Sequence, residues 1–170
     1  MQIMETQRLI LREMTQNDFT ALCAILEDDA VMTAYEGAFS DPEVQEWLDR
    51  QLRRYETDQV GLWAVILKES GSMIGQCGLT VQMWNNRKLL EVGYLFARAF
   101  WHHGYATEAA VACRNYAFDR LNATAVYSII RDTNTASQRV AERNGMKIVD
   151  RGVRHYKGID MPHFLYEIER

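Results

Sequence analysis

A glycine-containing turn between an apolar strand and a helix is the part of the sequence best suited to chemistry. The strand ends in E-V-G-Y-L-F (91–96), and W-H-H-G-Y-A-T-E-A (101–109) leads into the helix. The free amides and the dipole of a helix N-terminus favour an anion. Gly104 allows the backbone to approach that anion closely. The segment predicts either a phosphate-binding turn or an ordinary strand-to-helix connection.

The sequence contains none of the common motifs for nucleotide, metal or serine hydrolase sites. The P-loop pattern G-x-x-x-x-G-K-[ST] is absent, no lysine lies near Gly104, and no G-x-G-x-x-G follows a strand. Gly75 and Gly78 lie within a strand, where bulges or close backbone approach explain them. His102 and His103 are adjacent and have no cysteine or aspartate nearby, so no metal site is predicted. A G-x-S-x-G nucleophile elbow is also missing.

Length and composition place these residues in one domain spanning 1–170. Of the 170 residues, 48% are apolar, which is enough for one core. The formal charge of -4 argues against nucleic-acid binding. Even the longest uninterrupted apolar runs, such as Leu62–Leu67, are far too short to span a membrane. The chain has three cysteines, an odd number, so a disulfide framework is not expected. No secretory signal begins the chain. We therefore expect a soluble protein of the reducing cytoplasm.

The first half of the chain reads as one strand, two helices and three strands. Strands are expected at Arg8–Met14, Leu62–Leu67, Met73–Met83 and Leu89–Phe96, the last three as an antiparallel meander. Thr15 is the expected N-cap of the first helix, and Ser40-Asp41-Pro42-Glu43 opens the second.

The second half alternates between helices and strands. Helices are expected at Tyr105–Arg120 and at Thr135–Asn144, the latter closed by Gly145. Strands are expected at Ala125–Ile130, Lys147–Tyr156 and His163–Ile168. The predicted order is β-α-α-β-β-β-α-β-α-β-β, an α/β (α+β) protein.

Four motifs in register resemble those of the GNAT superfamily of N-acetyltransferases. The segment 103–109 is similar to the acetyl-CoA loop of that family. The segment N-T-A-S (134–137), followed by V-A-E-R-N-G-M (140–146), resembles the second GNAT segment in the N-x-x-S form of the RimJ/RimL-type subgroup, which acetylates ribosomal proteins. E-V-G-Y (91–94) and R-L-I-L-R (8–12) resemble the fourth and the opening strand of that subgroup.

The resemblance implies a fold and a cosubstrate. The fold is a mixed, mostly antiparallel sheet of about six or seven strands with helices on both faces. The cosubstrate is acetyl-CoA, whose pantetheine arm pairs with the fourth strand where that strand splays from the fifth. The implied cofactor-binding residues are Leu95, Phe96 and Arg98 through their backbone, the turn residues His103, Gly104, Tyr105, Ala106 and Thr107, and Asn134. Asn134 has the alternative of a plain helix N-cap.

The resemblance also supplies catalytic candidates. Glu91 is the candidate base, because the strand places it beside the cofactor arm; an ordinary strand salt bridge is the alternative. A lone glutamate has a pKa of about 4.3, so Glu91 is expected to be ionised at neutral pH. Ser137 matches a position that protonates the departing thiolate, with helix capping as its alternative. Many GNAT enzymes have a tyrosine acid at the position of Ala141, so that acid is missing here.

The expected function is acetyl transfer from acetyl-CoA to a primary amine by direct attack in a ternary complex. Tyr35, His155 and Tyr156 are the candidates for contact with the acceptor. The subgroup resemblance favours a protein N-terminal amine. A small-molecule amine (polyamine, amino acid or antibiotic), a CoA-binding sensor without catalysis, and a nucleotide-phosphate site remain alternatives. Neither nucleic acid nor membrane is an expected partner. The oligomeric state stays open, although homodimers are common in the family.

Overall fold

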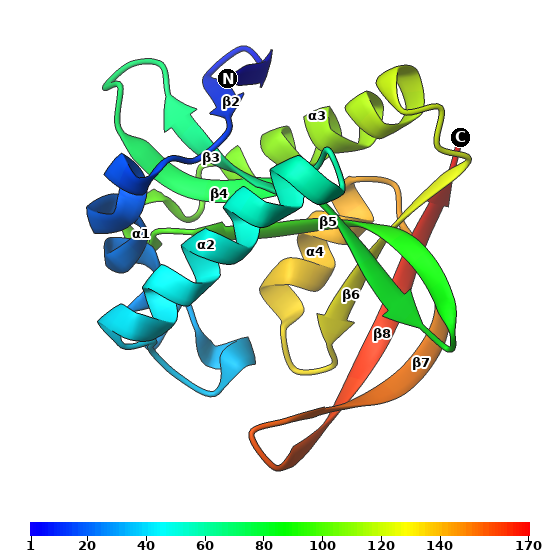
Figure 1. The fold of residues 1–170 in the computed structure, drawn as a ribbon. Coiled ribbons are helices and arrows are strands. Elements are labelled where there is room, and N and C mark those ends of the chain that lie inside the picture. Colours follow the sequence, from blue (N-terminus) through cyan, green and yellow to red (C-terminus); the bar gives the residue numbers. More distant parts are fainter.

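Eight strands, four α-helices and three short 3₁₀ turns make up the computed structural model, which describes residues 1–170 (Figure 1). The strands are β1 (Gln2–Glu5), β2 (Leu9–Arg12), β3 (Leu62–Leu67), β4 (Met73–Trp84), β5 (Arg87–Phe96), β6 (Ala125–Arg131), β7 (Lys147–Tyr156) and β8 (Ile159–Glu169). The helices are α1 (Phe19–Leu26), α2 (Asp41–Thr57), α3 (Tyr105–Arg120) and α4 (Thr135–Arg143). The 3₁₀ turns are η1 (Gln16–Asp18), η2 (Thr33–Tyr35) and η3 (Arg98–Phe100).

Local capping signals set the helix boundaries. The Thr15 hydroxyl accepts a hydrogen bond from the Asn17 amide, and the Asp18 carboxylate accepts one from the Thr15 amide, which completes a capping box. Ser40 and Glu43 form a second capping box at the start of α2. The Ser40 capping box confirms the predicted start of α2. Thr15 caps the 3₁₀ turn η1, which leads into α1, so the α-helix itself begins later than predicted, at Phe19. No helix of the chain combines the length and the apolar composition that crossing a membrane requires.

The sheet opens between β5 and β6. Its strand order is β1-β2-β3-β4-β5-β6-β8-β7, and β3, β4 and β5 form the predicted antiparallel meander. The β5–β6 pair is the parallel one, and its register contains the single pair Glu91↔Tyr127. Figure 1 shows β6 and β8 running steeply away from β5. The second half of β5 is therefore unpaired on its β6 side.

Two hydrophobic clusters cover the two faces of the sheet. On one face, α1 and α2 pack over Leu62 and Ala64 of β3, through residues such as Leu22 and Leu48. On the other face, α3 packs over Trp63 and Val65 and contributes Ala109, Ala110, Cys113 and Ala117. These small side chains let α3 lie close to the strands. Helices thus flank both faces of the sheet.

Glycines in β4 permit two close approaches. A Cβ atom on Gly78 would lie 2.0 Å from the Gly61 carbonyl oxygen, and one on Gly75 would lie 2.6 Å from the Phe96 ring. The β3–β4 register also shifts beside Gly75. The predicted bulge and close-approach roles are confirmed.

Three expectations about the strands were wrong. The sheet has eight strands rather than six or seven, because β1 pairs with β2 as an exposed edge strand that lacks a clear apolar pattern. The expected strand Arg8–Met14 is limited to Leu9–Arg12. The last strand begins at Ile159, not at His163. Pro162 lies within β8, and its backbone faces β6 beyond Arg131, where the β6–β8 pairing ends. Its carbonyl accepts a hydrogen bond from the Asp132 amide. No hydrogen bond of the sheet needs the N–H that proline lacks, so the strand tolerates Pro162.

Candidate active site

A cleft of about 490 Å³ lies where β5 and β6 separate. Its walls come from the second half of β5, the end of β6, the start of α4, one side of α2, and the β7–β8 hairpin. Of the sequence-predicted site residues, it brings together Tyr35, Glu91, Leu95, Asn134, Ser137, His155 and Tyr156. The turn residues 103–107 and Phe96 do not line this cleft.

Glu91 sits at the point where the two strands part. Its carboxylate accepts a hydrogen bond from the Ile129 amide of β6 at 3.0 Å and one from the Thr80 hydroxyl at 3.3 Å. Burial raises the pKa of Glu91 to about 7, although these hydrogen bonds and the positive charges of Arg154 and Arg54 act in the opposite direction. The expectation of a fully ionised glutamate at neutral pH was therefore wrong. A carboxylate with a pKa near the working pH suits general base catalysis.

The raised pKa of Glu91 predicts a pH-dependent stability. Its folded-state pKa of about 7 exceeds the ordinary pKa of a glutamate. The contribution of Glu91 to the free energy of unfolding is therefore complete below the unfolded-state pKa and is lost as pH rises through about 7. Glu91→Gln keeps the acceptor for the Ile129 amide and removes the ionisation. We expect the Tm of this variant relative to wild type to increase between about pH 5 and about pH 8. Thermal unfolding across this range checks it, with the exposed strand residue Glu169→Gln as control; a Tm difference independent of pH would contradict the assignment.

The β6-facing edge of β5 has one free position between two occupied ones. The Val92 carbonyl accepts a hydrogen bond from the Ser128 hydroxyl at 2.7 Å. The Phe96 carbonyl accepts one from the Trp101 indole at 2.9 Å. Backbone groups of alternate residues point to the same side of a strand, so the N–H and C=O of Tyr94 face the gap between these two. An added extended chain can pair with β5 there.

The same alternation changes the expected role of Leu95. Its register partner is Gln76 of β4, and its carbonyl oxygen lies 2.8 Å from the position of a Cβ on Gly75. The backbone of Leu95 therefore faces β4 and is not available in the gap, contrary to expectation. Its side chain lines the cleft instead. The backbone groups that face the gap are those of Tyr94, and the Phe96 amide faces the same side.

The turn before α3 presents a row of free amides. Gly104 is the N-cap, with a left-handed backbone at φ +79°. None of the backbone amides of residues 102–107 donates a hydrogen bond to another part of the chain. They stand at the N-terminus of a 16-residue helix, where the dipole adds to their positive potential. This arrangement fits an anion such as a pyrophosphate.

Arg8, the residue before β2, contacts this turn and was not predicted as a site residue. Its guanidinium donates to the His103 carbonyl at 2.9 Å and to the Glu108 carboxylate at 2.7 Å, and it stacks over the Tyr105 ring at 4.5 Å. Its remaining terminal nitrogen, Nη2, lies 3.5 Å from the position of a Cβ on Gly104. Arg8 therefore adds a positive charge beside the free amides. The contacts join residues about 100 positions apart, so no local pattern reveals them.

The start of α4 faces the cleft from the β6 side. The Asn134 side chain accepts from the Ser137 amide at 3.2 Å, which confirms its N-cap role. The Tyr94 hydroxyl donates to the Ser137 carbonyl at 2.7 Å and so connects β5 to α4. Burial raises the pKa of Tyr94 well above its usual range, so this phenol stays protonated. The Ser137 hydroxyl makes no hydrogen bond within the chain and lines the cleft.

Aromatic side chains form one wall of the cleft. The Tyr35 ring meets Tyr156 edge to face at 6.2 Å and Trp47 at 5.6 Å, which joins η2, the β7–β8 hairpin and α2. In Figure 1, the hairpin projects beyond the body of the sheet on the same side as η2. His155 has a side chain that is 78% exposed and pairs with Asp160. Tyr35 and Tyr156 are therefore placed deeper in the cleft wall than His155.

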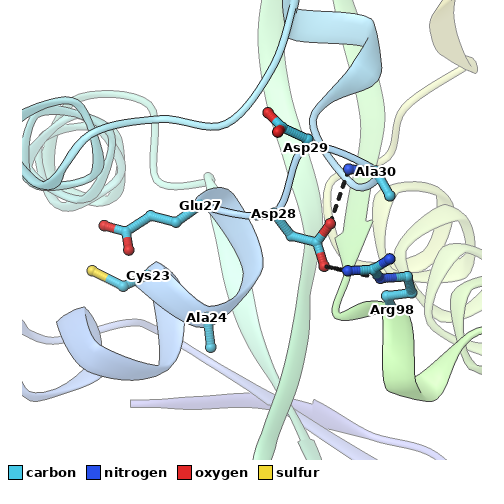
Figure 2. A pocket seen from close by; sticks show the side chains of 7 residues that line it. All are labelled: Cys23, Ala24, Glu27, Asp28, Asp29, Ala30 and Arg98. Atoms are coloured by element: carbon cyan, nitrogen blue, oxygen red, sulfur yellow. Dashed lines mark hydrogen bonds and ion pairs between the residues drawn. The ribbon is translucent and has the colours of Figure 1, made fainter.

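Arg98 lies in a different cavity. Its side chain pairs with Asp28 at 2.9 Å, in a hollow beside the end of α1 (Figure 2). Cys23 and Glu27 line the same hollow, and their ligand atoms lie within 4.8 Å of a carboxylate oxygen of Asp41. Burial and the neighbouring Glu27 raise the pKa of Cys23 to about 11, so this thiol is protonated at neutral pH and is a poor metal ligand.

Comparison with known proteins agrees with this geometry. Residues 8–147 match the acetyltransferase (GNAT) domain family. The chain is 39% identical to Bacillus subtilis YkkB over 142 residues, or 83% of each chain. It is 27% identical to YnaD, an N-acetyltransferase of the same organism, over 84% of this chain and 81% of the relative.

Solved structures share the whole fold. An acetyltransferase from Agrobacterium tumefaciens superposes with a TM-score of 0.82 at 29% identity, covering 98% of this chain and 94% of the other. RimL, a ribosomal L7/L12 alpha-N-protein acetyltransferase in complex with coenzyme A, superposes with a TM-score of 0.81 at 17% identity, covering 99% and 98%. That last likeness shows the fold alone. The chain belongs to the GNAT family of acetyltransferases, which transfer the acetyl group of acetyl-CoA to an amine.

Proposed function

We propose that the chain acetylates the N-terminal amine of a protein or peptide, with Glu91 as the base. The observation that carries this proposal is the place of Glu91: its carboxylate lies in the cleft at the point where β5 and β6 part. The acceptor enters past Tyr35 and Tyr156, and the cosubstrate enters along the open edge of β5. The two reactants meet beside Glu91.

The residues present fit acetyl-CoA. The free amides of residues 102–107 and the charge of Arg8 suit its pyrophosphate. The free backbone groups of Tyr94 suit the amide-bearing pantetheine arm, with Asn134 on the opposite wall. When bound, the cosubstrate supplies an acetyl thioester that a neutral amine can attack. Arg98 is left out of this set because it does not line the cleft, its carbonyl accepts a hydrogen bond from the Trp101 amide, and its side chain pairs with Asp28.

Proton transfer is the task of this chain's own side chains. An ammonium cannot attack a carbonyl, so Glu91 accepts a proton from the acceptor, directly or through one water. A pKa of about 7 makes the carboxylate a stronger base than an exposed glutamate and leaves about half of it ionised at neutral pH. We assign to the Ser137 hydroxyl, which has no hydrogen-bond partner within the chain, the donation of a proton to the leaving sulfur, and the hydroxyl regains its proton from solvent.

Ser137→Ala tests the acid role. We expect kcat to fall by about 10- to 100-fold, at the lower end of the general-acid range, because a thiolate leaves readily without help. The affinity for acetyl-CoA and the Tm are expected to stay near wild type, since Asn134 caps the helix through the Ser137 backbone. Steady-state kinetics, calorimetric titration and thermal unfolding separate these effects. A loss limited to Tm or to affinity would assign Ser137 to packing or binding instead.

The acceptor class rests on more distant support. Solved structures of the same fold include enzymes described as acting on ribosomal proteins, RimL among them. Tyr35 and Tyr156 line the same cleft as Glu91, so an extended N-terminus that passes these rings can reach the base. A small-molecule amine is the competing acceptor. We also propose a cytoplasmic location, which agrees with three free cysteines.

A screen of amines decides between these acceptors. Thiol release from acetyl-CoA is measured with N-terminal peptides, polyamines, amino acids and aminoglycosides, and the products are identified by mass spectrometry. Acetylation of peptide N-termini with higher kcat/KM than any small amine supports the proposal. A preference for a small amine would overturn the acceptor class. Binding of acetyl-CoA without transfer to any amine would instead indicate a CoA sensor.

A further inference from the structure

Positive charge is concentrated in the cleft of an otherwise acidic protein. The chain has 23 acidic and 19 basic residues. The residues that line the cleft nevertheless include four arginines and a single carboxylate, Glu91. The arginines are Arg50 and Arg54 of α2, Arg131 of β6 and Arg154 of β7. The amine of an acceptor needs only Glu91, so the arginines require another explanation.

Three of these arginines lack a strong carboxylate partner. Arg131 is neutralised by an ion pair with Glu36. Arg54 makes one contact, at 3.3 Å to the Gln51 side chain, and Arg154 donates to the Met83 carbonyl at 2.9 Å. Arg50 has Glu46 one helical turn away at 3.6 Å, and both of these side chains are largely exposed.

Arg54 is the arginine in the least favourable surroundings. Burial and the neighbouring Arg50 lower the pKa of Arg54, which shows that desolvation and like charge both act on its cation. Glu91 and Arg54 shift each other's pKa, so the two groups are electrostatic neighbours. An anion placed between Arg50 and Arg54 would relieve their repulsion and would lie close to the base. A polycationic acceptor would add to the repulsion.

We propose that Arg50 and Arg54, assisted by Arg154, bind an anionic group of the acceptor, which is therefore an N-terminal peptide with acidic residues just after its first residue. The inference rests on the proposed function and deepens it: Glu91 receives the amine, and the arginines select the carboxylates that follow. Arginine suits this task because its planar donors match a carboxylate. A free acidic amino acid carries the same chemistry and is separated from a peptide by the experiment.

The experiment compares matched peptides with wild-type protein. Three amidated peptides begin with serine and continue with two glutamates, two glutamines or two lysines, and free glutamate is the small-molecule arm. We expect kcat/KM for the glutamate peptide to exceed that of the glutamine peptide by about 5- to 10-fold, and the lysine peptide to be the poorest. The preference is expected to decrease with added salt. Free glutamate outperforming the peptide would assign the arginines to a small acceptor and overturn the peptide class.

Variants of α2 link the preference to the arginines. Arg54→Gln is expected to remove most of the advantage of the glutamate peptide through KM, and Arg54→Glu to reverse the order in favour of the lysine peptide. Arg53→Gln is the matched control, since Arg53 is the adjacent, exposed arginine of α2 outside the cleft. The affinity for acetyl-CoA is measured with each variant. It is expected to be unchanged, because the anion cradle at residues 102–107 lies elsewhere.

The outcomes separate this inference from the proposed function. Equal losses on all three peptides in Arg54→Gln, or a fall in acetyl-CoA affinity, would overturn the anion site while leaving acetylation of N-termini intact. Acetylation of peptides without any charge preference in the wild type would do the same. The absence of transfer to any peptide would overturn the proposed function itself.

Discussion

Replacing Glu91 with glutamine is expected to lower kcat by about 10²- to 10⁴-fold, the span usual for a general base. Glutamine preserves the size of the side chain and the acceptor for the Ile129 amide, so the cleft should keep its shape. It has no basic carboxylate, so the acceptor must lose its proton without help. The affinity for acetyl-CoA is expected to stay nearly unchanged, because the free amides that suit its pyrophosphate lie at residues 102–107. Steady-state thiol release and calorimetric titration of acetyl-CoA measure the two quantities.

A rise in pH is expected to rescue this variant in part, because more of the acceptor amine is then already neutral. Glu169→Gln, on an exposed position of β8 outside the cleft, serves as the control and should keep wild-type activity. Full activity of Glu91→Gln at neutral pH would contradict the base role and would move it to water or to another residue. His155 is a weak substitute, since it is exposed and paired with Asp160.

Gly104→Val is expected to abolish the thermal shift that acetyl-CoA gives the wild type. The backbone of Gly104 has φ +79°, which branched side chains rarely adopt, and the added methyl groups enter the space beside the free amides and Arg8. Both effects act on the anion cradle. The far-ultraviolet circular dichroism spectrum is expected to stay near wild type, since α3 packs on the sheet through the small side chains of its buried face.

Gly71→Val provides a matched control for the strain. Gly71 has φ +71° and open space around its Cα atom, in a turn remote from the cleft. It should lower the Tm through the backbone and leave the shift by acetyl-CoA intact. If the Gly104→Val variant, like the Gly71→Val control, keeps the wild-type affinity for acetyl-CoA, the assignment of the phosphate-binding turn is wrong.

Elements with strong local signals were predictable from the sequence. The helix Tyr105–Arg120 and the strand Leu62–Leu67 have the bounds expected from periodicity and apolar runs. Capping residues set the starts of η1 and α2, because a cap acts within three positions of the chain. In contrast, β1 is a four-residue edge strand whose side chains are exposed or half-buried, so it has no burial pattern to detect.

The site was predictable in its motifs and not in its electrostatics. The placement of Glu91 follows from the strand, whereas its pKa of about 7 depends on burial between β5 and β6. The brace formed by Arg8 and the arginines of α2 arise from contacts between residues far apart in sequence. The backbone groups in the gap belong to Tyr94 and not to Leu95, because alternate residues of β5 face β4 and β6. A shift of one residue in register would reverse this orientation, and the sequence does not determine the register to one residue.

The pH dependence of kcat/KM tests the role of Glu91 most directly, with an N-terminal peptide as the acceptor. In the wild type, the ionised carboxylate of Glu91 takes the proton from the acceptor amine, so the logarithmic profile should fall with a slope of about one below the pKa of Glu91, at about pH 7. Glu91→Gln needs an amine that is already neutral, so its profile should fall below the higher pKa of a terminal amine, at about 7.7 to 8.0. Profiles that fall below the same pH in both proteins would contradict the assignment of Glu91 as the base.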